Sequence, residues 1–453
     1  MRNREKKQPN PHRIGVGKML AWQCEGASVA LNAVLLGALQ LYCTNALGLS
    51  AALVGTILMV TKLVDGVTDL FAGYIVDKTN TKLGRGRPYD LCVLGLWLTT
   101  WLMFSVPAEF SVFVKCAWIA VCYTLCQSVF RTFLNASGTA YMVRAFNDDQ
   151  KYIKINSLGG LMVTCCVIVF NVIFPGMQAQ VLSSAPGWSR LIACFALPLG
   201  IIGMMRFLFV PEKYDVESEE NKNVTVKHIV ELLKTNRNIY PVCILQFVFA
   251  IATGISVGSY YYLYIVGDLG LMGTMSLLNV IVMPTMLLYP LVMRKLSTTK
   301  LVQIGCFMYL LSGPIGFIAK DNLVLLAISS LIAGCGMLPI SYMSGLFIID
   351  CADYNEWQNR PRMEGTLGAI TGFANKIGSA FSSFLLGVLL SASGFDGTQT
   401  VQTPSALLMI RFANSMVPMI FMVIAGIALL FFGIDRIKPV MTKELEERRR
   451  TRE

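Results

Sequence analysis

Three charged residues, Lys62, Asp65 and Asp69, lie inside one apolar stretch of the chain, "TKLVDGVTDLFAGYIV". In a helix, positions three and four residues apart share a face, so both carboxylates form one stripe with Lys62 and with the hydroxyl of Thr68 nearby. Carboxylate and hydroxyl oxygens are ligands for a hard cation such as Na⁺. Two neighbouring buried carboxylates can also share a proton. The sequence therefore predicts a site for Na⁺ or H⁺ at Asp65, Thr68 and Asp69. The alternative is a structural ion pair of Lys62 with one aspartate.

A lysine and an arginine also lie within apolar stretches. Lys376 is surrounded by small residues in "GFANKIGSAFSSFLLG", a composition that lets helices approach closely. We expect its amine to meet the aspartates or a substrate hydroxyl, the alternative being a side chain that extends to the membrane surface. Arg131 is typical either of an anion-binding residue or of a partner for an acid such as Glu25. Glu25 itself could contact substrate or lie solvated at a helix end. Two further polar candidates for substrate binding accompany Arg131, namely Gln127 and Asn135.

The elements that must position these charges are membrane helices. Of the 453 residues, 55% are hydrophobic and 14% charged, whereas soluble domains carry about 25% charged residues. Most apolar segments reach the roughly 20 residues that a membrane span requires. An all-α integral membrane protein with twelve spans is predicted, at about 22–43, 51–76, 89–107, 111–143, 155–175, 190–211, 240–266, 271–293, 301–319, 322–349, 366–392 and 404–434.

The distribution of positive charge predicts the topology. Most lysines and arginines lie in the two terminal segments, in alternate loops and in the polar segment 212–237. By the positive-inside rule, both termini and this segment face the cytoplasm, in the cell (inner) membrane. Anionic lipid then accounts for the net charge of +11 without a nucleic-acid partner. We expect an N-terminal six-helix half (1–211), a cytoplasmic central loop (212–237) and a C-terminal six-helix half with its tail (238–453), the plan of the major facilitator fold.

Two separated motifs resemble one family of transporters. "DGVTDLFAGYIVDKTNTKLGRGRP" and "DCADYNEWQNRPRMEG" followed by "NKIGSAFSSFLLGVLL" are similar to signatures of the glycoside–pentoside–hexuronide:cation symporters, which include the melibiose permease. The resemblance implies that Asp65 and Asp69 bind the cation and that Lys376 lies close to both cation and sugar, with Lys62 ahead of them. It also implies cytoplasmic gating contacts at Asp77, Arg85, Arg87, Asp350, Asp353, Tyr354, Arg360 and Arg362.

The chain departs from this family in the part that binds sugar. Residues 110–147 contain no Asp or Glu, and Arg131 stands where the melibiose permease uses an acid. A basic residue in place of an acid suits an anionic sugar, and a substrate that is not a sugar is an open alternative. The prediction is cation-coupled symport of a sugar, glycoside or hexuronide by a monomer that needs no cofactor besides Na⁺ or H⁺. The alternatives are a carrier of an organic anion, lipid or drug, and an uncoupled facilitator. The sequence does not predict an enzyme, because the apolar segments contain no histidine and no metal-binding cluster.

Overall fold

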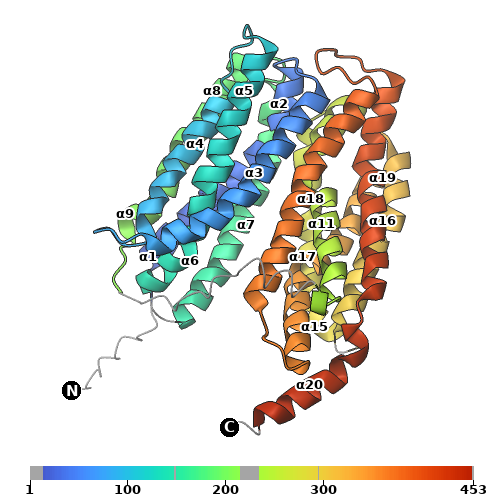
Figure 1. Cartoon of the computed structure of the whole chain (residues 1–453). Coiled ribbons are helices and arrows are strands. Elements are labelled where there is room, and N and C mark those ends of the chain that lie inside the picture. The colour runs from blue at the N-terminus through green and yellow to red at the C-terminus, as the bar shows by residue number, and fades with distance from the viewer. Residues whose placement is uncertain (1–13, 147–148, 215–233, 294, 451–453) are drawn as a thin grey trace, which may run out of the picture. The chain divides into compact units, whose positions relative to one another are not determined.

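The computed structural model describes residues 14–146, 149–214, 234–293 and 295–450, and within these ranges the chain is helical without a strand (Figure 1). The helices pack into two compact units. The first comprises the described parts of Met1–Leu39, Val67–Asn171 and Ser184–Glu220, and the second those of Gln40–Gly66, Val172–Ser183 and Asn221–Glu453. Each unit is described by itself below.

Two long helices contribute to both units. The first unit contains the C-terminal part of α3 (Ala51–Lys78) and most of α7 (Asp149–Ala179), and the second unit contains the remainder of each. The other elements of the first unit are α1 (Val16–Leu36), η1 (Arg87–Leu91), α4 (Cys92–Met103), α5 (Val112–Thr124), η2 (Leu125–Arg131), α6 (Thr132–Phe146), α8 (Ala185–Gly203) and α9 (Met205–Phe209).

The second unit is built around four long helices joined by shorter ones. The long helices are α16 (Thr298–Ala319), α17 (Leu323–Trp357), α18 (Glu364–Ala392) and α19 (Pro404–Ala428). The shorter elements are α2 (Leu39–Asn45), α11 (Ile239–Gly254), α12 (Gly258–Tyr261), η3 (Tyr262–Val266), α13 (Gly270–Ser276), α14 (Leu278–Val282), η4 (Met283–Leu288), α15 (Tyr289–Val292), η5 (Leu429–Phe431) and α20 (Ile434–Arg450).

Ten helical segments in the described residues are long and apolar enough to cross a membrane, two fewer than the sequence predicts. The expected span at 89–107 is the short helix α4, which follows the 3₁₀ turn η1 without a break. The expected span at 271–293 is divided into α13, α14, η4 and α15. Pro284 lies in the first turn of η4, and because proline has no backbone N–H it cannot donate to an α-helical hydrogen-bond ladder. The all-helical membrane class is confirmed, but the described residues do not supply twelve helices of spanning length.

Buried polar pairs join the helices inside the first unit. Trp97 Nε1 donates to Ser28 Oγ (2.7 Å), and Asn32 Nδ2 donates to Thr100 Oγ1 (2.8 Å). Lipid offers no hydrogen-bond partners, so a polar group between helices must find its partner in the protein. Large apolar side chains such as Leu197, 74% exposed, instead cover the outside of the bundle, as expected of surface that contacts acyl chains.

Candidate functional site

The predicted aspartate–lysine contact is present in the second unit. Lys376 on α18 places Nζ 3.2 Å from Oδ2 of Asp65 on α3. The two side chains are 33% and 22% exposed, so both are shielded but remain accessible. This is the contact expected if the lysine amine meets the aspartate rather than the membrane surface. The arrangement places a carboxylate and an ammonium group within two segments of spanning length, where charged groups are costly unless paired.

Lys62 belongs to the same contact surface of α3 and α18. Its Nζ donates to Ser383 Oγ (2.8 Å) and to the carbonyl oxygen of Ser379 (3.1 Å). Both hydrogen bonds of the Lys62 amine thus reach α18. The alternative of a structural ion pair between Lys62 and an aspartate of α3 stays a prediction. Lys376, Ser379 and Ser383 follow one another at helical spacing and form the polar face of α18.

Two glycines allow α3 and α18 to approach closely on this surface. A Cβ atom on Gly387 would lie 2.4 Å from the carbonyl oxygen of Ala51, and one on Gly55 would lie 2.6 Å from that of Ser383. Both distances are shorter than any contact a real Cβ makes. The small residues therefore fix the spacing of the helices that carry Asp65 and Lys376.

Asp69 lies one helical turn beyond Asp65 on α3 and has its partner in the first unit. Thr132 Oγ1 donates a hydrogen bond of 2.8 Å to Asp69 Oδ1. Thr68 is half-buried on the same helix. The structure therefore gives the two aspartates different neighbours, an ammonium group for Asp65 and a hydroxyl group for Asp69.

The polar candidates of the fourth predicted span lie at a π-helical turn. Gln127 and Arg131 both belong to the π-helix η2, and Arg131 Nη1 donates to Gln127 Oε1 at 3.3 Å. Asn135 follows on α6 with an exposed side chain. π turns are rare and frequently occur at functional sites, because the extra residue changes the direction of the side chains. Thr132, the partner of Asp69, is the residue that directly follows this turn.

Glu25 is buried in an ion-pair cluster rather than solvated at a helix end. Arg206 Nη1 lies 2.7 Å from Glu25 Oε2, and the same guanidinium group binds both oxygens of Asp90. Its central carbon lies 5.0 Å from the ring of Trp22 and 5.2 Å from that of Tyr141. Arg131 therefore has no part in pairing Glu25. The buried acid finds its charge partner on α9, which lies far from it in the sequence.

The loop after α3 is held by a single carboxylate of the first unit. Glu212 accepts hydrogen bonds from the backbone amides of Arg85 (3.0 Å), Gly86 (2.8 Å) and Arg87 (2.7 Å). Gly84 precedes them with φ +116°, a conformation that favours glycine, and its added Cβ would meet the Glu212 carboxyl group at 2.4 Å. The Arg87 side chain covers the ring of Phe207. The side chain of Asp77, a predicted gate residue, lies outside the described residues.

The predicted gate residues of the second unit form their own ion-pair group. Arg362 pairs with Asp353 (2.7 Å), Glu356 (2.5 Å) and Glu364 (2.7 Å). Asp350 pairs instead with Lys438 of α20 (2.7 Å). Arg360 donates to the carbonyl oxygen of Thr235 (3.1 Å), and the ring of Tyr354 contacts that of Trp357. The expected binding of this group to the loop after α3 stays a prediction.

Sequence reasoning missed several of these partners. Thr132 and Ser383 carry ordinary hydroxyl groups in apolar helices and give no signal of their own. Asp90 and Arg206 lie at the ends of predicted spans, where charged residues are normally solvated. A signal was available for Glu212, because an acid follows a proline where the chain leaves the last span of the first half.

Comparison with known proteins identifies the class of this chain. The sequence profile of the family described as MFS/sugar transport protein matches residues 25–436. The isoprimeverose transporter of Lactiplantibacillus pentosus is 25% identical, and the match covers 90% of this chain and 87% of that protein. The uncharacterized symporter YnaJ of Bacillus subtilis is 29% identical, with 90% of each chain covered. The glucuronide carrier protein homolog of Escherichia coli is 25% identical, with 93% of each covered.

Solved structures support the fold. A bacterial homolog of the human lysosomal transporter Spinster, inward-facing and occupied, superposes with a TM-score of 0.70 at 10% identity, covering 95% of this chain and 98% of that one. The nucleoside transporter NupG superposes with a TM-score of 0.63 at 13% identity, covering 91% and 99%. At such low identity the likeness concerns the arrangement of helices alone.

Proposed function

The chain belongs to the family described as MFS/sugar transport protein, and from this premise we propose that it couples the uptake of a sugar or glycoside to the entry of Na⁺ or H⁺. It is a multi-pass membrane transport protein and not an enzyme. The observation that carries the proposal is the contact of Lys376 Nζ with Asp65 Oδ2 at 3.2 Å. A carboxylate that is paired with an ammonium group between two membrane helices can exchange that ammonium group for a metal cation or a proton.

The proposed cation ligands are Asp65, Asp69 and Thr68, and the coupling residue is Lys376. When the cation binds Asp65, the Lys376 ammonium group is released and can donate hydrogen bonds to a substrate hydroxyl. Substrate bound to Lys376 in turn leaves Asp65 to the cation, so each ligand raises the affinity for the other by the same factor. No cofactor is required beyond the coupling ion.

The substrate class follows from the relatives and from the polar groups of η2 and α6. Among the relatives, one is named for isoprimeverose and another for glucuronides. Gln127 and Asn135 suit the hydroxyl groups of a sugar, and the Arg131 guanidinium group suits a carboxylate such as that of a glucuronide. We further propose a monomer in the cell membrane with both termini in the cytoplasm, as the distribution of positive charge predicts.

Transport into proteoliposomes tests the proposal. Radiolabelled isoprimeverose and methyl glucuronide are offered with an imposed Na⁺ gradient, with an H⁺ gradient, or with neither. We expect accumulation against a substrate gradient with one of the two cations, and its loss in Asp65→Asn and Asp69→Asn. Glu109→Gln, which removes an exposed acid, is the matched control and should transport normally. Undiminished gradient-driven accumulation in Asp69→Asn would contradict the cation assignment.

A further inference from the structure

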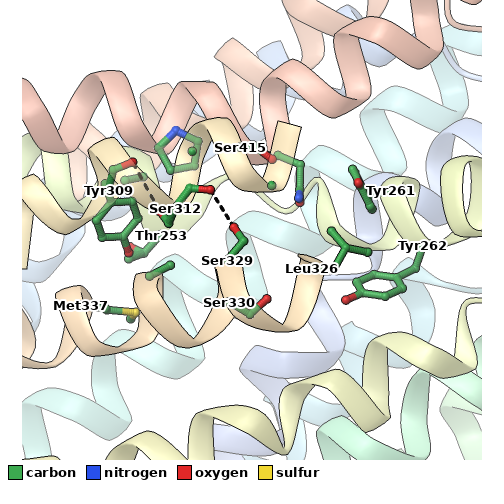
Figure 2. Close-up of a pocket in the computed structure, with 16 residues that line it drawn as sticks. Thr253, Tyr261, Tyr262, Tyr309, Ser312, Leu326, Ser329, Ser330, Met337 and Ser415 are labelled. Atoms are coloured by element: carbon green, nitrogen blue, oxygen red, sulfur yellow. Dashed lines mark hydrogen bonds between the residues drawn. The ribbon is translucent and has the colours of Figure 1, made fainter. Parts of the chain in front are cut away.

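The second unit contains a cavity of about 330 Å³ outside the proposed coupling site. It is lined by residues of α11, α12, η3, α16, α17 and α19, whereas the Asp65–Lys376 pair lies on α3 and α18. Its lining combines hydroxyl groups with tyrosine rings and small apolar side chains, and none of the lining residues carries a formal charge. Figure 2 shows the hydroxyl groups of three helices gathered around it, with Ser312 on α16, Ser329 on α17 and Ser415 on α19.

Two polar side chains that line this cavity have hydroxyl groups without a partner among the described residues. Tyr309 and Ser415 are only 8% and 7% exposed. Neither side-chain hydroxyl group hydrogen bonds to any described residue of the chain. A hydroxyl group at a cavity surface can both donate a hydrogen bond to a bound molecule and accept one from it. Unpaired groups that line a cavity therefore point to a polar guest.

A proline in α19 leaves one backbone carbonyl group beside the cavity without its usual helical donor. Pro418 lies inside α19 and lines the cavity together with Asn414, four residues earlier. Because proline has no N–H, the backbone carbonyl group of Asn414 loses its usual helical donor. The cavity thus presents donors and acceptors together. The tyrosine rings of Tyr262 and Tyr309 supply flat apolar surface beside them.

We propose that this cavity is a second binding site, which takes a neutral polyhydroxylated molecule about the size of a monosaccharide. A sugar ring has hydroxyl groups at its edge and C–H groups on its faces, and this lining offers partners for both. Its volume lies at the lower end of the range for small-molecule pockets, about 300 to 1,000 Å³, and so suits one ring rather than two. The absence of charge among the described lining residues excludes uronic acids, since an unpaired carboxylate would be costly to bury here.

Binding of D-xylose to the purified full-length protein in nanodiscs tests the proposal. We expect saturable binding by equilibrium dialysis of the labelled pentose, without competition from D-glucuronate. Tyr309→Phe and Ser415→Ala each remove one hydroxyl group and should weaken binding by about fivefold or more. Ser330→Phe should abolish it by filling the cavity. Tyr342→Phe is the matched control, because this tyrosine is 55% exposed and lies outside the cavity.

The same measurement separates this site from the proposed coupling site. Asp65→Asn should leave xylose binding unchanged, whether or not it abolishes transport. Absence of saturable xylose binding to the wild-type protein would overturn the proposal. Unchanged affinity in both Tyr309→Phe and Ser330→Phe, with each variant shown to be folded by its thermal unfolding, would overturn it as well.

Discussion

Thr132 Oγ1 donates a hydrogen bond of 2.8 Å to Asp69 Oδ1, and Thr132 is the first residue after a π-helical turn. The Asp69 carboxylate, which we propose as a ligand of the coupling cation, thus accepts a hydrogen bond from the Thr132 hydroxyl group. An additional backbone contact, from the same Oγ1 to the carbonyl of Gln127 at 3.2 Å, ties Thr132 to the π turn.

Removal of this hydroxyl group should weaken cation coupling. Thr132→Val keeps the shape of the side chain but leaves Asp69 without the donor. We expect the cation concentration for half-maximal uptake to rise by roughly three- to tenfold, equivalent to one hydrogen bond. Thr132→Ser should behave as wild type. Thr164→Val, which removes a hydroxyl group that donates to the carbonyl oxygen of Gly160 one turn earlier in α7, should have no effect on cation dependence. If the cation concentration for half-maximal uptake were the same in Thr132→Val and wild type, cation binding at Asp69 would not depend on the Thr132 hydroxyl group.

Neutralising Lys376 should separate cation binding from substrate transport. In Lys376→Met, Asp65 keeps its carboxylate but loses the competing ammonium group at 3.2 Å. We expect cation binding, measured as a thermal shift with added Na⁺ or as proton uptake at fixed pH, to be retained or tightened, while coupled uptake is lost. Lys300→Met, at an exposed position, serves as the control. Loss of both cation binding and uptake would mean that the lysine holds the aspartate in place instead of competing for it.

Enlarging Gly387 should force α3 and α18 apart. The carbonyl oxygen of Ala51 lies only 2.4 Å from the position of an added Cβ, and backbone cannot give way as a side chain can. Gly387→Val should lower stability by about 1 to 3 kcal/mol and reduce the midpoint of thermal unfolding. Gly372→Ala on the same helix meets no atom within 4 Å and should unfold as wild type does or at slightly higher temperature. Unchanged unfolding of Gly387→Val would show that this close approach does not limit helix packing.

The buried cluster of Glu25, Asp90 and Arg206 should be sensitive to the loss of its single cation. Arg206→Met leaves two acids buried without a charge partner, at a cost of about 3 to 5 kcal/mol. The triple variant Arg206→Met, Glu25→Gln, Asp90→Asn should recover part of this loss, because no uncompensated charge remains. Thermal unfolding of both variants measures the difference. Arg190→Met at an exposed position provides the control, and a triple variant no more stable than Arg206→Met would exclude the charge explanation.

The features that could be predicted from the sequence are those that depend on residues close together in the chain. Apolar length predicted the membrane class, and the two motifs predicted the family, which the sequence profile over residues 25–436 confirms. The position of Lys376 among small residues predicted its contact with an aspartate, because only a cavity or a close helix makes a mid-span lysine tolerable. The roles of the predicted cation, substrate and gate residues stay predictions.

Other features could not be predicted because they depend on partners remote in the sequence. The burial of Glu25 follows from Arg206, which approaches it from 181 positions further along the chain. The division of the apolar segment 271–293 near Pro284 could not be predicted, because apolarity alone does not reveal where the backbone breaks. The count of twelve spans stays a prediction. The hydroxyl-lined cavity is formed by residues of several elements that lie far apart in the sequence, and none of these residues gives a signal on its own.

Glu212 gives the loop after α3 a mechanical connection to the segment that leads out of the first unit. Its carboxylate holds three successive amides of residues 85–87, and these follow the helix that carries both aspartates. The Glu212 carboxylate therefore anchors the loop that ends α3 to the residues that directly follow α9, within the first unit.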